Sequence, residues 1–422
     1  EKMAYLVALV SLSFFLFNFY CDKTLGSASV LINLYWGVNV FLSELRLFDL
    51  PDTSPHVYLI ILVGIVFFNI GCISARNLKI KKITKPKVYI LNTRLLKYAF
   101  ILVFIYLLIF DLAVINLTLS GVDFWTIRYL YLNDIFTNSI FGFDLAYKLR
   151  LFLVDPLLFA YVSAFFSSLV VTEHIDWKFL LRAILLTVME YFAFGGRMLL
   201  LYWVSGALVS YSSLKKMSLM SNKKLMRWIK RLLVIFIISL PLVIIIRGGR
   251  GGHIFKSTYT YFVGSLPFLT QRIPNIGDKT YFVSSFQGLI RPIMGVLQIF
   301  NIEWEIFEKA NLFLLENHNT VVVMGYYGGK ANTFNYFINC FGYFFKDGGY
   351  IGVVIFSFIW GVAAASLFKG MKRYGNNLYR TYFYIIVIYA VLISMMDFVM
   401  VESTFACSLF YYPFLIKRKR EE

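Results

Sequence analysis

Hydrophobic runs about as long as a membrane-spanning helix recur along the whole chain, and no other feature constrains the fold as strongly. A helix needs about 20 apolar residues to cross a hydrocarbon core of about 30 Å. Eleven runs approach that length, at 3–20, 27–45, 57–74, 98–117, 151–170, 179–194, 198–214, 232–246, 350–368, 381–400 and 402–416. Because 59% of the 422 residues are hydrophobic and only 15% are charged, the runs predict spans in lipid instead of a soluble core.

Basic residues are concentrated beside these runs. Clusters of eight, seven, four and four residues, at 76–97, 215–231, 369–380 and 417–420, hold 23 of the 41 Lys and Arg. Cytoplasmic loops of membrane proteins carry an excess of Lys and Arg, which predicts that all four clusters face the cytoplasm. Topology and contact with anionic lipid therefore account for the net charge of +18, and we infer no nucleic-acid partner.

Runs and clusters together predict an all-α polytopic integral membrane protein with three regions. Residues 1–246 form an N-terminal transmembrane bundle, 247–349 a large external loop region with short interfacial helices, and 350–422 the C-terminal spans and a basic cytoplasmic tail. Two aromatic stretches, 258–269 and 332–345, are short or interrupted. The expected number of spans is therefore about eleven, within ten to thirteen. With the four basic clusters in the cytoplasm, successive spans cross the membrane in alternating directions, which places the N-terminus outside.

Cysteine and histidine residues give no framework for covalent or metal stabilisation. The sequence has four Cys without a CxxC pair and four scattered His without metal-ligand spacing. No Walker motif or acidic pair typical of metal-dependent nucleotide-sugar enzymes occurs. We therefore infer no disulfide, no metal and no cofactor.

Three arginine-containing elements map to the external side. They are Gly195-Gly196-Arg197, the run RGGRGGH at 247–253, and Arg291-Pro292. Glycine lets backbone N–H groups approach an anion closely, and Arg offers planar bidentate donors to phosphate, so the elements predict a pyrophosphate cradle. An Arg at a helix end also commonly anchors the helix at the interface, but a run of four glycines and two arginines is a poor anchor.

Candidates for acid-base chemistry are few. They are Asp347 in the sequence KDGGY, Glu402 at a helix junction, Glu316, His318 and His253. Three of them have a plain structural alternative: Asp347 could end a helix in a turn, Glu402 could neighbour an N-cap, and His318 could be a hydrogen-bonded loop residue.

Short segments resemble a known family. The segment GYYGGKANTFNYFINCFGYFFKDGGYIGVVIFSFIWG, at 325–361, is similar to the C-terminal signature of O-antigen and capsule repeat-unit polymerases, the Wzy family. GGRM at 195–198, RGGRGG at 247–252 and YFVGSLPFL at 261–269 also resemble elements of that family. The similarity covers the whole chain in layout and these segments in detail.

The resemblance implies a metal-independent, GT-C-like glycosyltransferase of the bacterial inner (cytoplasmic) membrane. Such an enzyme polymerises oligosaccharide repeat units of lipopolysaccharide O-antigen or capsular polysaccharide on its external face, from undecaprenyl-pyrophosphate-linked donor and acceptor. Membrane lipids and a chain-length regulator are its implied partners. It implies Arg197, Arg247, Arg250 and Arg291 on the pyrophosphate, Tyr326 as a substrate contact, and Asp347, His253 or His318 as base or acceptor contacts.

Two other functions stay open at this point. A flippase or transporter for lipid-linked oligosaccharide would also need cations for pyrophosphate, although only Asp111 and Glu190 stand out as charges within predicted spans. An O-antigen ligase performs the same chemistry on a different acceptor.

Overall fold

The computed structural model describes most of the chain as helices. The described residues are 2–78, 89–123, 126–127, 145–194, 198–217, 225–235, 254–319, 321–328, 330–335, 338–374 and 377–418. They divide into two compact units: unit 1 comprises 1–82, 250–373 and 386–402, and unit 2 comprises 83–249, 374–385 and 403–422.

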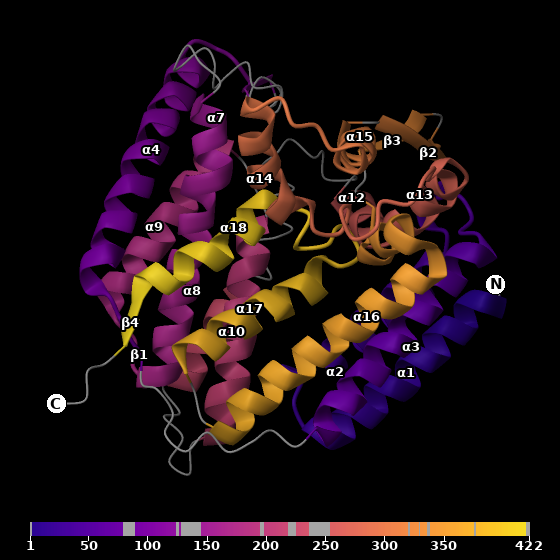
Figure 1. Cartoon of the computed structure of the whole chain (residues 1–422), viewed down its shortest axis with the longest axis horizontal. Coiled ribbons are helices and arrows are strands. Elements are labelled where there is room, and N and C mark those ends of the chain that lie inside the picture. The colour runs from indigo at the N-terminus through magenta and orange to yellow at the C-terminus, as the bar shows by residue number, and fades with distance from the viewer. Residues whose placement is uncertain are drawn as a thin grey trace. The chain divides into compact units, whose positions relative to one another are not determined.

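Unit 1 is built on three long helices that run side by side, α1 (Lys2–Asp22), α3 (Pro55–Asn77) and α16 (Cys340–Tyr374), together with α2 (Ala28–Glu44) (Figure 1). Its other elements are short: η1 (Leu47–Asp49), α12 (Ile254–Val263), α13 (Ser265–Arg272), η4 (Ile273–Asn275), α14 (Gln287–Ile299), α15 (Glu305–Asn319) and the antiparallel hairpin β2 (Val321–Tyr327) with β3 (Lys330–Asn335). The hairpin was not predicted, although a valine run followed by Gly328 at a φ of +60° is a strand-and-turn signal.

Small and amide residues bring the long helices of unit 1 together. A Cβ added at Gly71 of α3 would lie 2.2 Å from the Phe358 carbonyl oxygen of α16, and one at Gly361 would lie 2.0 Å from that of Phe68. Asn69 of α3 also accepts a 2.7 Å hydrogen bond from Asn18 of α1. Close backbone approach and hydrogen bonds between buried side-chain amides hold helices together in lipid, where the hydrophobic effect does not favour helix association.

Unit 2 is a second helical bundle. It contains α4 (Thr93–Leu119), α7 (Leu145–Leu149), the π-helix η2 (Arg150–Val154), α8 (Asp155–Thr172), α9 (Trp177–Phe194), α10 (Met198–Met217), α18 (Ser403–Tyr411) and η5 (Tyr412–Leu415), with β1 (Tyr89–Leu91) antiparallel to β4 (Ile416–Arg418). A Cβ at Gly206 of α10 would lie 2.2 Å from the Phe166 ring of α8, so this close contact also depends on glycine. The first half of helix α17 (Leu378–Ile393) belongs to unit 2, and its second half belongs to unit 1.

Five described helices are long and apolar enough to cross a membrane, at 2–22, 55–77, 93–119, 146–172 and 340–371, and two shorter apolar helices follow at 198–214 and 378–393. The protein is therefore a helical, membrane-embedded protein. The predicted count of about eleven spans is not confirmed. The run at 402–416 becomes the short α18 and a 3-10 turn at Pro413, because proline cannot continue a helix interior. The run at 381–400 ends its helix at Ile393.

Candidate functional site

The predicted site residues are only partly within the described chain. Arg197, Arg247, Arg250 and His253 lie outside the described residues, and His318 is described only as a backbone position of α15. The structure describes the side chains of Arg291, Asp347 and Tyr326, and all three belong to unit 1.

Asp347 connects two segments of unit 1. It precedes the break in α16 at Gly348 and Gly349, where Gly349 has a φ of +61°. Asp347 is 1% exposed. One oxygen accepts hydrogen bonds from the Thr280 hydroxyl at 2.7 Å and the Ser284 N–H at 3.0 Å, and the other accepts from the Ser285 N–H at 2.9 Å.

These bonds give Asp347 a positioning role in the fold. A further hydrogen bond, from the Tyr281 N–H to the Asp347 carbonyl at 3.0 Å, extends the attachment along the backbone. The segment 280–285 that Asp347 holds leads directly into α14, which carries Arg291. Because the residue is buried and both carboxylate oxygens accept hydrogen bonds within the protein, this geometry favours a structural role for Asp347, and its predicted catalytic role stays a prediction.

The N-terminus of α14 packs against the connection between α17 and α18, residues 394–402. The Gly288 N–H donates to the Met400 carbonyl at 3.0 Å. A Cβ at Gly288 would lie 2.6 Å from both the carbonyl carbon and oxygen of Glu402. Only glycine permits this approach without a shift of one backbone, so Gly288 sets the position of α14 relative to Glu402.

That connection carries two neighbouring carboxyl groups. Asp397 is 1% exposed and lies beside the carboxyl group of Glu402, which is partly exposed, and beside the hydroxyl of Tyr343. Burial raises the pKa of Asp397 well above its ordinary value, and the charge of Glu402 raises this pKa further. A second negative charge beside a buried carboxyl group disfavours its ionised form, so the environment of Asp397 favours its protonated form.

Arg291 provides positive charge at the same site. Its guanidinium is partly exposed and interacts electrostatically with Tyr343, the residue beside Asp397. The Arg291 Nη2 lies 3.5 Å from the Asn311 side-chain oxygen, which also accepts from Gln287 at 3.1 Å. The site therefore combines a guanidinium, two amides and a pair of neighbouring carboxyl groups.

Sequence reasoning found part of this site. It named Arg291 and Glu402, and it missed Asp397, which the predicted span at 381–400 absorbed. An ionisable residue in an apolar run is itself a signal of function, and that signal was present at Asp397.

Tyr326 lies apart from this group in its contacts. It belongs to β2, its side chain is 66% exposed, and no described hydrogen bond or ring contact joins it to Arg291 or Asp347. Its predicted role as a substrate contact stays a prediction.

Unit 2 contains a separate group of buried charges. The Arg150 guanidinium lies 3.0 Å from Asp155 and 3.9 Å from Glu190, and its central carbon lies 3.6 Å from the centre of the Phe194 ring. Glu190 was one of only two charges named within predicted spans, where a transporter would be expected to carry more. Buried carboxylates in a helix bundle are commonly paired with a cation, whether or not the protein is a transporter. The ion pair of Glu190 with Arg150 therefore does not distinguish a transporter from other membrane proteins.

Comparison with models of protein families, with curated proteins and with solved structures gave no match for this chain. Function is therefore inferred from the chemistry of the described residues together with the resemblance of the short segments.

Proposed function

We propose that the protein is a bacterial inner-membrane glycosyltransferase that polymerises polyprenyl-pyrophosphate-linked oligosaccharide repeat units into O-antigen or capsular polysaccharide on the external face. One observation supports the proposal most: Arg291 interacts electrostatically with Tyr343, which lies beside the Asp397–Glu402 carboxyl pair, and Gly288 attaches the start of α14 to Met400 of the same connection. The resemblance of residues 325–361 to repeat-unit polymerases supplies the substrate class.

Glu402 is the group best suited to act as the base. It is partly exposed, whereas Asp397 and Asp347 are both 1% exposed. In the proposed step Glu402 takes the proton of an acceptor sugar hydroxyl while that oxygen forms a bond to the anomeric carbon of the donor. General-base catalysis of this kind contributes about 10²–10⁴-fold in rate.

Arg291 acts on the other side of the reaction. The bond from the anomeric carbon to the pyrophosphate oxygen breaks, and its electron pair remains on the departing polyprenyl pyrophosphate. A guanidinium held in place by the fold stabilises this developing charge, and its two-point donor geometry suits phosphate oxygens. Asp347 supports the step by holding the segment that leads into α14.

A deletion strain, compared with the same strain carrying the gene on a plasmid, tests the function in cells. We expect surface polysaccharide limited to a single repeat unit without the protein, and a ladder of chain lengths once it is restored. The flippase alternative predicts no repeat unit at the surface. The ligase alternative predicts polymer that accumulates on its lipid carrier, and either result would contradict the proposal.

A further inference from the structure

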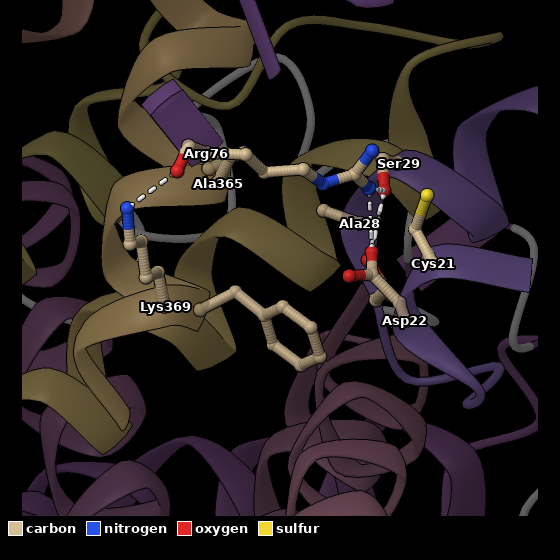
Figure 2. Close-up of a pocket in the computed structure, with 10 residues that line it drawn as sticks. Cys21, Asp22, Ala28, Ser29, Arg76, Ala365 and Lys369 are labelled. Atoms are coloured by element: carbon tan, nitrogen blue, oxygen red, sulfur yellow. Dashed lines mark hydrogen bonds and ion pairs between the residues drawn. The ribbon is translucent and has the colours of Figure 1, made fainter. Parts of the chain in front are cut away.

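A cavity of about 240 Å³ lies in unit 1, at the end of α16 that is distant from the carboxyl pair. It is formed by the C-terminal ends of α1 and α3, the N-terminus of α2 and residues 364–369 of α16 (Figure 2). The unbroken part of α16, from its break at Gly349 to Ala365, spans about 24 Å at a rise of about 1.5 Å per residue. That length is most of the thickness of a hydrocarbon core, about 30 Å.

Arg76 supplies the central polar group of this cavity. Its Nη2 donates to Asp22 at 2.7 Å and to the Ser29 hydroxyl at 2.9 Å, as Figure 2 shows. Its other terminal nitrogen, Nη1, is buried and has no hydrogen-bond partner among the described residues. A buried guanidinium N–H without a partner is destabilising, so an acceptor in the cavity would be stabilising.

Lys369 adds a second positive charge. Its ammonium group donates to the backbone carbonyls of Arg76 at 2.6 Å and Leu78 at 2.7 Å, which fixes the C-terminal end of α3. The lining thus contains two cations and one carboxylate, that of Asp22. This balance favours an anion.

The remaining walls are apolar or small. Phe368, Ala364 and Ala365 of α16 line the cavity together with Ala28 of α2. The volume is far above the about 10–15 Å³ that one water needs, and below the about 300–1,000 Å³ of usual small-molecule sites. A compact headgroup fits this space, whereas a nucleotide sugar or an oligosaccharide does not.

The surrounding sequence indicates where this ligand comes from. Arg76 and Lys369 begin two of the basic clusters predicted to face the cytoplasm. Basic pockets between transmembrane helices on that side bind the headgroups of anionic lipids. We propose that the cavity binds the phosphate of a membrane phospholipid through Arg76, with Phe368 and the two alanines of α16 against the start of the acyl chains.

Native mass spectrometry of the full-length, delipidated protein tests this proposal. Titration with phosphatidylglycerol should give one lipid adduct that saturates before the others. Arg76→Gln should weaken this adduct about tenfold or more, since it removes a charge-assisted contact. Arg94→Gln is the matched control, because Arg94 is an exposed residue of the same basic cluster outside the cavity, and it should leave the adduct unchanged.

Ala365→Leu guards against a folding defect at Arg76. It fills the cavity without removing any charge, and it should also weaken the adduct at an unchanged melting temperature. Diacylglycerol, which lacks phosphate, should not bind. Equal adducts for wild type and both cavity variants, or equal binding of diacylglycerol, would overturn the proposal. Binding of inorganic phosphate in place of phosphatidylglycerol would overturn the lipid source.

Discussion

Glu402 and Asp397 are neighbours with opposite environments, and this difference separates their proposed roles. The partly exposed Glu402 can reach a substrate, whereas the buried Asp397 keeps a raised pKa through burial and through its neighbour's charge. Glu402→Gln should therefore lower the polymerisation rate by about 10²–10⁴-fold, the usual contribution of a general base. Asp397→Asn mimics a protonated carboxyl and should keep most of the activity. Rates normalised to immunoblotted protein would measure both, and the reverse order would contradict the assignment.

Arg291 offers a test that separates charge from shape. Arg291→Ala should cost about a hundredfold in rate, equivalent to on the order of 3 kcal/mol of transition-state stabilisation, without loss of protein from the membrane. Arg291→Lys should recover only part, since lysine keeps the charge but loses the planar, two-point donor geometry. Arg46→Ala is the matched control, because Arg46 forms an exposed ion pair with Asp52. A normal ladder from Arg291→Ala at normal abundance would remove Arg291 from the site.

Arg250 gives the same test for the part of the predicted cradle that lies outside the described residues. Arg250→Ala should abolish polymer at unchanged protein abundance, and Arg250→Lys should restore part of it. If Arg250 holds only a lipid headgroup, chain-length ladders from both variants will be close to wild type.

Among single residues, candidate site residues in the predicted loops were easier to identify than those within the hydrophobic runs. Arg291 was predicted because an arginine on the external side departs from the usual distribution of positive charge. Asp397 was missed because its apolar neighbours in the run 381–400 satisfied the criterion for a span. Asp347 was predicted as a catalytic candidate, but sequence cannot show that Thr280, Ser284 and Ser285 bind its carboxylate.

Among the elements, α14 links the fold to the proposed chemistry, and two of its glycines provide a paired experiment. A Cβ at Gly288 meets the Glu402 backbone at 2.6 Å, whereas one at Gly295 meets nothing within 4 Å. Gly288→Ala should displace α14 from Glu402 and lower activity about tenfold or more. Gly295→Ala should keep activity and raise stability by about 0.5–1 kcal/mol, the usual gain in a helix interior. Equal activities for the two variants, measured with melting temperatures, would show that the contact at Gly288 does not matter.

The long helices could be predicted closely and the short elements could not. The runs at 3–20 and 57–74 became α1 and α3 with a few more residues at their ends, since membrane spans must satisfy their backbone hydrogen bonds internally. The stretch at 332–345 instead became the end of β3 and the beginning of α16. The local sequence pattern of this stretch favours no single structure. The break in α16 that follows it depends on Gly349 and on contacts with 280–285, which are distant in the sequence.

For the whole molecule, the side of the membrane on which each region lies is the first requirement of the proposal. In a Cys21→Ser background, which removes the one exposed free cysteine among the described residues, Gly251→Cys should react with an impermeant maleimide in intact cells. Ser221→Cys, in the basic cluster at 215–231, should react only after permeabilisation. Labelling in the opposite pattern would reverse the topology and place the proposed site on the cytoplasmic side.

The most direct test of the proposed function is reconstitution of the reaction. Purified full-length protein would be supplied with undecaprenyl-pyrophosphate-linked repeat units in the presence of EDTA, and product length and released carrier pyrophosphate would be measured together. We expect the wild-type protein to form a ladder with one pyrophosphate carrier released per added unit, and Glu402→Gln at equal concentration to form almost none. Absence of polymer from folded wild-type protein, dependence on added magnesium or manganese, or a wild-type ladder from Glu402→Gln would contradict this account.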